Sequence, residues 1–214
     1  SFSKKMFSAI VIQKLLGESI IRYLSSLHMA IKSTIYKAHL AIANIDLGYY
    51  ADHSLTLARH PSETDERMMV RLIALALQAH QIQTVCQGDG IIAFGAGLSD
   101  AQEPDVSLRD FSDQIQCWIE VGQPEDRPII KACGKARQVY VYAYHHAAEV
   151  WFRAIENKLT RLNNLEIHRI TSASAQGLLV FAKRSMQLQA TILEGQLTIS
   201  DGQESVDVQI ERWK

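Results

Sequence analysis

The chain has 214 residues, a length that favours one domain with a sizeable core over two small ones. Its 22 Lys and Arg residues nearly balance its 23 Asp and Glu residues, so the net charge of -1 excludes nucleic-acid binding by bulk positive charge, and any phosphate-binding surface must be local. A hydrophobic share of 47% with four prolines excludes wholesale disorder, and three scattered cysteines predict a reducing compartment, the cytoplasm.

Residues 1–28 form a predicted N-terminal extension ahead of the main domain. Gln13, Lys14 and Glu18 interrupt the apolar stretch, so the segment does not fit a secretory signal. The chain has no run of 18 apolar residues, and we expect no membrane span and no membrane partner. One interpretation is an amphipathic segment that lies on a partner or membrane surface. The other, which we favour, is that Met29 is the natural start and that residues 1–28 are translated upstream sequence or a peripheral extension.

The first elements of the main domain are a strand and a buried helix. Alternating apolar and polar residues predict a strand over 30–45. Pro61 and Ser62 mark the start of a helix, and the apolar run 68–77 predicts that this helix is buried. Short apolar pieces around 83–86 and 91–94, separated by glycines, predict further strand and turn.

The second half alternates between strands and helices. The apolar run 115–121 predicts a central strand that Pro124 ends, and 125–137 predicts a helix with acidic residues early and basic residues late. The remaining predictions are a strand over 138–144, a sheet extension at 150–152 with a helix to about 162, a strand over 165–170, a helix over 174–188, and strands over 191–199 and 206–210. This order predicts an α/β fold with a mixed sheet flanked by helices.

Two acidic residues have a spacing that suits a divalent cation. Asp105 follows a proline, and Glu120 lies fifteen residues later inside the predicted central strand. Carboxylate oxygens are the ligands that Mg2+ prefers. The alternative is that Asp105 is a turn residue and Glu120 a strand residue, each paired with an arginine.

Several longer motifs add a family resemblance to this spacing. From Met29 the chain resembles the YaeQ family of bacterial proteins over nearly all of residues 29–210, through IKSTIYKAHLAIANID, HPSETDERMMVRL, WIEVGQP, IIKACGKARQVYVYAY and SMQLQATILEGQL. This resemblance implies that residues 29–214 form one domain with a PD-(D/E)XK restriction-endonuclease-like αβββαβ core and additional strands. It also implies that Asp105 and Glu120 hold the metal, Mg2+ or Mn2+, and that Glu63 or Glu66 is the acidic residue of the preceding helix.

The lysine of the superfamily motif is missing from its place. That lysine lies two residues after the glutamate, where its side chain shares a strand face with it, but Gly122 occupies the position here. Gln123 reaches the same face only if Gly122 forms a bulge. Lys131 and Lys135, four residues apart on the next predicted helix, are the other candidates for the missing charge.

Each supporting residue also has a purely structural interpretation. Glu63 and Glu66 stabilise a helix N-terminus through the helix dipole alone. Arg67 and Arg71, one turn apart, either grip phosphates or neutralise those acids. Lysines on a helix face are usually solvated charges.

Three functions follow from these residues. The first is a Mg2+-dependent phosphodiesterase acting on nucleic acid, in which Asp105 and Glu120 hold the metal and Gln123 or Lys131 assists. The second is a binding module that keeps the nuclease-like scaffold without its chemistry and recognises nucleic acid or a protein of the transcription or translation machinery. The third is a metal-dependent enzyme for small phosphorylated compounds. We expect a monomer in each case.

Overall fold

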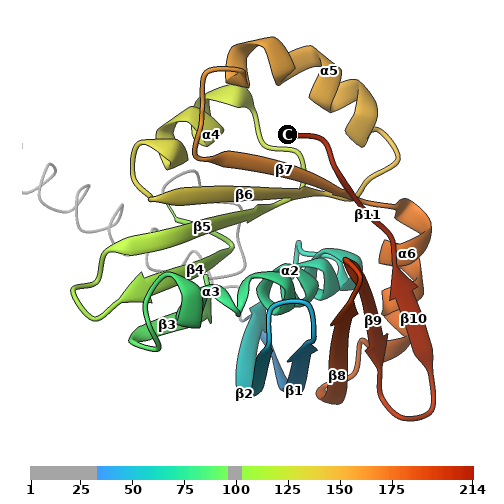
Figure 1. Ribbon diagram of the computed structural model, residues 1–214. Coiled ribbons are helices and arrows are strands. Elements are labelled where there is room, and N and C mark those ends of the chain that lie inside the picture. The colour runs from blue at the N-terminus through green and yellow to red at the C-terminus, as the bar shows by residue number, and fades with distance from the viewer. Residues whose placement is uncertain (1–32, 96–102) are drawn as a thin grey trace, which may run out of the picture. The chain divides into compact units, whose positions relative to one another are not determined.

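A computed structural model describes residues 33–95 and 103–214, which form an α/β unit with two mixed sheets (Figure 1). The α/β fold class agrees with the prediction, whereas the single predicted sheet is replaced by two. The N-terminal extension predicted over 1–28 lies outside the described residues. Among the helices of the described ranges, none has the length and apolar character needed to cross a membrane.

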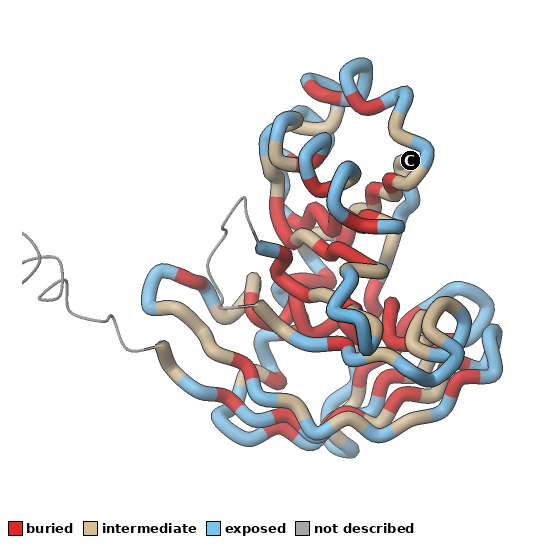
Figure 2. Tube along the Cα trace, turned by 90° about the vertical axis from the view of Figure 1, so that its left-hand side faces the viewer, coloured by how far each residue is buried: buried red, intermediate tan, exposed pale blue. Residues whose placement is uncertain are grey.

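The first sheet, sheet A, has five strands in the order β10-β9-β8-β1-β2. β1 pairs antiparallel with β2 on one side and parallel with β8 on the other. Along β1 buried positions alternate with more exposed ones, because successive side chains of a strand point to opposite faces, and Figure 2 shows this alternation along the lower sheet. The strands are β1 (Thr34–Asn44), β2 (Tyr49–Arg59), β8 (Ser185–Leu193), β9 (Gln196–Ser200) and β10 (Ser205–Val208).

The second sheet, sheet B, has six strands in the order β11-β7-β6-β5-β4-β3. β5, β6 and β7 are parallel to one another, so their carboxyl ends meet at the same edge. Both faces of this parallel core are covered, which explains the near-continuous burial of β6. The strands are β3 (Gly90–Phe94), β4 (Val106–Asp110), β5 (Ile115–Val121), β6 (Gln138–Ala143), β7 (Leu165–Ile170) and β11 (Ile210–Arg212).

The central helix α2 (Asp65–Gln78) lies between the two sheets (Figure 1). Its residues from Met68 to Ala76 are buried, and all of them except Arg71 are apolar, as expected for a helix covered on all sides. Thr64 caps its N-terminus by accepting a hydrogen bond from the backbone N–H of Arg67 at 3.1 Å. The main core is therefore shared by α2 and the inner faces of both sheets.

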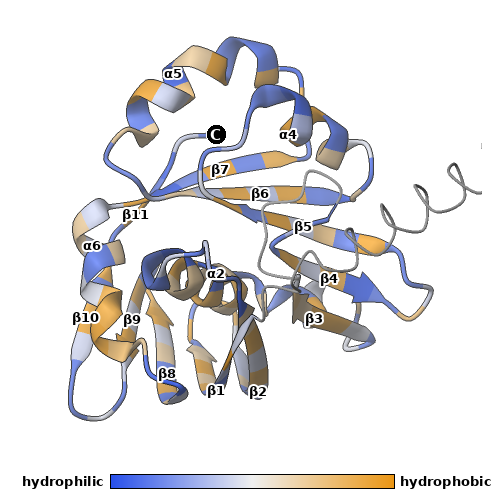
Figure 3. Ribbon diagram, turned by 180° about the vertical axis from the view of Figure 1, so that it is seen from behind, coloured by the Kyte–Doolittle hydropathy of each residue, from blue (hydrophilic) through white to orange (hydrophobic). Residues whose placement is uncertain are grey.

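Two helices cover the other face of sheet B (Figure 1). Val139 and Val141 of β6 pack into the small core beneath them, whereas Tyr140 and Tyr142 point to the side of α2. Figure 3 shows both hydrophilic and hydrophobic stretches in these helices. The two are α4 (Asp126–Cys133) and α5 (Ala148–Leu159), and the remaining helical segments are α3 (Gln81–Thr84), α6 (Ser172–Gly177) and the 3-10 helix η1 (Leu178–Phe181).

Three predicted elements of short or mixed pattern are wrong. The strand around 83–86 overlaps the short helix α3, because an apolar piece of four residues has no periodicity that separates strand from helix. Residues 150–152 belong to α5 and do not extend the sheet. The helix over 174–188 ends at Phe181, and the alternately buried residues of β8 begin at Ser185.

The C-terminal strands also differ from their predicted limits. The strand predicted over 191–199 is divided by a hairpin turn at Glu194 and Gly195, which have φ angles of +52° and +74°. The strand predicted over 206–210 is likewise divided between β10 and β11, which belong to different sheets. β2 and β4 had no predicted counterparts.

Candidate functional site

The candidate site lies where the carboxyl ends of β5 and β6 meet the first turn of α2. Open α/β sheets bind ligands at this edge, because loops rather than further sheet follow the strands there. A cavity of about 310 Å³ is present at this position. Its lining consists of Arg67, Glu120, Val121, Gly122, Gln123, Pro124, Tyr144 and His145.

Asp105 is fixed beside this cavity by two hydrogen bonds. Its side chain is buried, and Oδ1 accepts a hydrogen bond from Arg67 Nη2 at 2.6 Å. Oδ2 accepts a hydrogen bond from the backbone N–H of Val121 at 2.7 Å. These contacts tie the start of β4 to the end of β5 and to α2, so the position of the carboxylate is set by three elements.

Glu63 is the second buried carboxylate of the cluster and precedes α2. Oε1 accepts a hydrogen bond from Arg67 Nη1 at 2.9 Å, and Oε2 accepts one from Arg71 Nη2 at 2.9 Å. Arg71 is fully buried and also donates to the backbone carbonyl of Ala58 at 3.1 Å. Of the two predicted acidic residues near the helix start, Glu63 therefore joins Asp105 through Arg67, whereas Glu66 lies partly exposed in the first turn of α2.

Glu120 adds a third carboxyl group to the cluster. Burial, and secondarily the nearby charge of Asp105, raise its pKa from 4.5 to about 8. Its Oε1 accepts a hydrogen bond from Trp118 Nε1 at 2.6 Å, and this bond partly offsets the shift. The two positive charges of Arg67 and Arg71 equal the two negative charges of Glu63 and Asp105, with which they form ion pairs. When Glu120 is ionised, its negative charge is therefore in excess of the charge of these two arginines.

Gly122 redirects the chain after Glu120. Its φ angle is +117°, a conformation that other residues rarely adopt, and its backbone N–H donates to the carbonyl of Tyr142 at 2.9 Å. A Cβ built on Gly122 would meet no atom within 4 Å, so the backbone conformation rather than space requires glycine. Beyond this turn Gln123 lines the same cavity as Glu120. A role for Gln123 in chemistry stays a prediction.

The two candidate lysines lie away from the cavity lining. Lys131 belongs to α4 and Lys135 to the turn after it, and both are exposed. Lys135 Nζ lies 5.3 Å from the centroid of the Trp118 ring. The structure thus brings Asp105, Glu120 and Gln123 together with Arg67, but neither lysine is among the residues that line this cavity.

The two carboxyl groups fit a divalent cation in part. Glu120 lies near enough to Asp105 for the charge of Asp105 to raise its pKa, and Mg2+ typically uses one or two protein carboxylates with water and substrate as further ligands. Within residues 33–95 and 103–214 there is no group of three or more His, Cys, Asp and Glu side chains that could form a complete protein cage. The donor set therefore suits a two-carboxylate site that a substrate completes.

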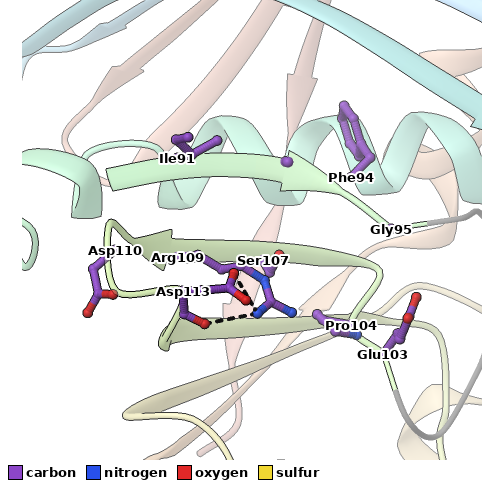
Figure 4. A pocket seen from close by; sticks show the side chains of 10 residues that line it. Ile91, Phe94, Gly95, Glu103, Pro104, Ser107, Arg109, Asp110 and Asp113 are labelled. Carbon is purple, nitrogen blue, oxygen red and sulfur yellow. Dashed lines mark hydrogen bonds and ion pairs between the residues drawn. The ribbon is translucent and has the colours of Figure 1, made fainter. Parts of the chain in front are cut away.

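A second cavity lies at the other side of β4. It has a volume of about 350 Å³ and lies beside β3, with an ion pair between Arg109 and Asp113 at 3.2 Å (Figure 4). Ser107 and Arg109 of β4 line it, but neither Asp105 nor Glu120 does. The two cavities are therefore lined by different sets of residues.

Comparison with known proteins shows that the chain matches one protein family over most of its length. The family YaeQ protein matches residues 29–210. The chain is 40% identical to the uncharacterized protein YaeQ of Salmonella typhi and 38% identical to that of Escherichia coli K12, in each case over 87% of this chain and 98% of the relative. Among solved structures, the YaeQ protein of Xanthomonas axonopodis pv. citri matches with a TM-score of 0.77 at 37% identity, covering 85% of this chain and 98% of that one. The YaeQ protein of Pseudomonas syringae gives 0.74 at 32% identity, with coverages of 85% and 96%.

Proposed function

Starting from the fact that the chain belongs to the YaeQ family, we propose that it is a divalent-cation-dependent phosphodiesterase with a PD-(D/E)XK-like core that acts on nucleic acid. The observation that carries this proposal is the pair of carboxyl groups of Asp105 and Glu120 at the edge of the parallel strands. The arginines do not balance the charge of ionised Glu120, so this group attracts either a proton or a cation.

Asp105 and Glu120 would hold Mg2+ or Mn2+. When bound, such an ion supplies Lewis-acid stabilisation of a phosphate and lowers the pKa of a coordinated water. The chain itself fixes the two carboxylates, since Arg67 and the backbone of Val121 orient Asp105 while Trp118 orients Glu120. Preorganised ligands of this kind avoid a reorganisation cost during the reaction.

The test is isothermal titration of the full chain with Mg2+ and with Mn2+, accompanied by cleavage assays on DNA and RNA. Glu120→Gln keeps the shape of the side chain and removes its charge, so we expect loss of metal binding and of cleavage. Glu66→Gln is the matched control from the start of α2 and should retain both. A wild-type chain that binds neither metal and cleaves neither polymer, with substrate present, refutes the proposal.

A second function is favoured by two specific observations. Gly122 occupies the position of the motif lysine, and both oxygens of Asp105 already accept hydrogen bonds. These features support a nuclease-fold module that binds nucleic acid, or a protein of the transcription or translation machinery, without cleaving it. A salt-dependent complex with intact nucleic acid after incubation with metal would favour this function over hydrolysis.

We also propose that the protein acts as a monomer in the cytoplasm. Cys86, Cys117 and Cys133 carry free thiols in the structure, which is consistent with a reducing compartment. Sedimentation of the purified chain tests the oligomeric state, and a stable dimer would refute the first part of this statement.

A further inference from the structure

We infer that a third cavity, between the two sheets at the C-terminal end of α2, binds a small uncharged heterocycle of the nucleobase class. This cavity has a volume of about 300 Å³ and is lined by residues of both sheets and of the last turn of α2. Among the described residues, none lines both this cavity and the one beside Glu120. The inference therefore depends neither on the proposed metal nor on cleavage.

Two buried side chains bring hydrogen-bond donors to the cavity. The hydroxyl of Tyr142 accepts a hydrogen bond from Gln78 Nε2 at 2.7 Å, and its own proton has no acceptor among the described residues. Burial raises the pKa of Tyr142, so the hydroxyl keeps that proton. Asn44 is 3% exposed, and its Oδ1 accepts a hydrogen bond from the backbone N–H of Leu47 at 3.1 Å, whereas its amide NH2 donates to no other residue in the described part of the chain. Buried donors are nearly always paired with a protein group, a water or a ligand.

Two histidines bring hydrogen-bond acceptors to the same cavity. His80 Nδ1 donates to the carbonyl of Leu77 at 2.9 Å, and His168 Nε2 donates to the carboxylate of Glu166 at 3.2 Å. Burial lowers the pKa of both imidazoles, so at neutral pH each carries one proton and its other nitrogen is left as an acceptor. The ring of His168 is stacked on that of Tyr142 with the centroids 5.2 Å apart, and this contact holds its orientation.

The charge of the lining favours a neutral ligand. Arg212 is the one formally charged side chain among the described residues that line the cavity. Its Nη2 lies 3.6 Å from Glu166 Oε1, and its Nε donates to the carbonyl of Lys214 at 3.1 Å. Because Glu166 balances this charge, an ionic ligand would lose its hydration without meeting an opposite charge in excess.

A nucleobase matches this combination of groups. Its edge carries both donors and acceptors, and its two faces are apolar. The edge can pair with the hydroxyl, the amide and the imidazoles, while the faces contact the aliphatic part of the lining. An aliphatic ligand would leave the buried donors unpaired. The aliphatic residues are Leu47, Leu77, Ile192 and Ile210.

The first experiment is isothermal titration of the full chain, without divalent metal, with adenosine, guanosine, cytidine and uridine. Indole is the control probe, because it is planar and aromatic but has only one hydrogen-bonding group. We expect at least one nucleoside to bind with a Kd of about 1 mM or lower and indole to bind at least about tenfold more weakly. No binding of any nucleoside, or equal binding of indole, overturns the inference.

A trinucleotide of the preferred base distinguishes the two sources of such a ring. Tighter binding than that of the nucleoside identifies the ligand as a base within a strand, and weaker binding identifies it as a free nucleoside. Both outcomes support the inference that the cavity recognises the base.

The second experiment locates the binding with a variant and a matched control. Tyr142→Phe removes the hydroxyl donor, so we expect the Kd of the preferred nucleoside to rise about threefold or more. Tyr140 lies on the same strand, and its hydroxyl likewise accepts a hydrogen bond from a glutamine, Gln81, at 2.9 Å, but it does not line the cavity. The Kd of Tyr140→Phe should therefore stay within about twofold of the wild type. An equal loss of affinity in both variants overturns the inference.

Asn44→Asp is the second cavity variant, and it tests the inference even where Tyr142→Phe fails to fold. The aspartate keeps an oxygen to accept from the backbone N–H of Leu47 but replaces the amide NH2. We expect it to raise the Kd of the nucleoside by about threefold or more while the chain retains a cooperative thermal melt. An unchanged Kd in the folded cavity variants overturns the inference and leaves the proposed function at Glu120 untouched.

Discussion

Replacing Glu120 with glutamine should stabilise the metal-free protein, and more strongly at alkaline pH. The pKa of Glu120 is raised from 4.5 to about 8 in the folded chain, first by burial and then by Asp105. A carboxyl with a raised pKa contributes its full stability below the unfolded value and loses it as the pH rises through the folded value. The wild type therefore loses stability between about pH 5 and pH 8, whereas the glutamine variant has no such loss at this position.

The size of the effect follows from the same two pKa values. Raising the pKa of this carboxyl from 4.5 to about 8 lowers the free energy of unfolding by about 5 kcal/mol once the group is fully ionised. About 3.5 kcal/mol of this loss develops between pH 5 and pH 8. These are upper bounds, because Glu120 lines a cavity and is partly open to water.

Urea denaturation at pH 5 and pH 8, without divalent metal, measures this difference. We expect the difference in free energy of unfolding between Glu120→Gln and wild type to widen by about one to a few kcal/mol as the pH rises, and by about 3.5 kcal/mol at most. Glu66→Gln, in a partly exposed position, should show no such widening. Equal gaps at both pH values would contradict the assignment of Glu120 as the unbalanced carboxyl.

Three further predictions concern the scaffold of the site. Gly122→Ala should lower stability by about 1 to 3 kcal/mol in thermal denaturation through its φ angle of +117° alone, and an unchanged melting temperature would contradict this. Arg71→Met leaves Glu63 buried without one of its partners and should lower the free energy of unfolding by about 3 to 5 kcal/mol in urea denaturation. An unchanged free energy of unfolding would show that buried Glu63 does not need Arg71. Trp118→Phe removes a hydrogen bond that lowers the pKa of Glu120, so carboxyl titration followed by NMR should show a still higher pKa; a lower one would refute the contact.

Local sequence patterns predicted the strands whose burial follows a regular pattern along the chain. β1 and β5 were anticipated because alternation or a continuous apolar run matches a strand with one or two covered faces. β2 was missed although it pairs with β1 along its whole length, since its inward positions include His53 and only partly buried residues that weaken the alternation. The division into two sheets had no local signal, because β1 joins β8 from about 150 residues further along the chain.

The site was predictable in part for a similar reason. Family resemblance indicated Asp105 and Glu120, and in the structure the charge of Asp105 is near enough to raise the pKa of Glu120. The spacing of Arg67 and Arg71, one turn apart, left open whether they bind phosphates or neutralise the nearby acids. It did not reveal that Arg67 reaches a carboxylate 38 residues away, because that contact depends on how α2 packs against sheet B.

The position of α2 between the two sheets has a consequence for amide hydrogen exchange. Its buried side chains belong to a core that contains both sheets, so local opening of the helix would expose apolar surface on two sides at once. The amide protons from Met68 to Ala76 should therefore exchange only by global unfolding. Arg67 lies one residue before this segment, so the side chain that holds Asp105 belongs to the start of a stable helix rather than to a loop.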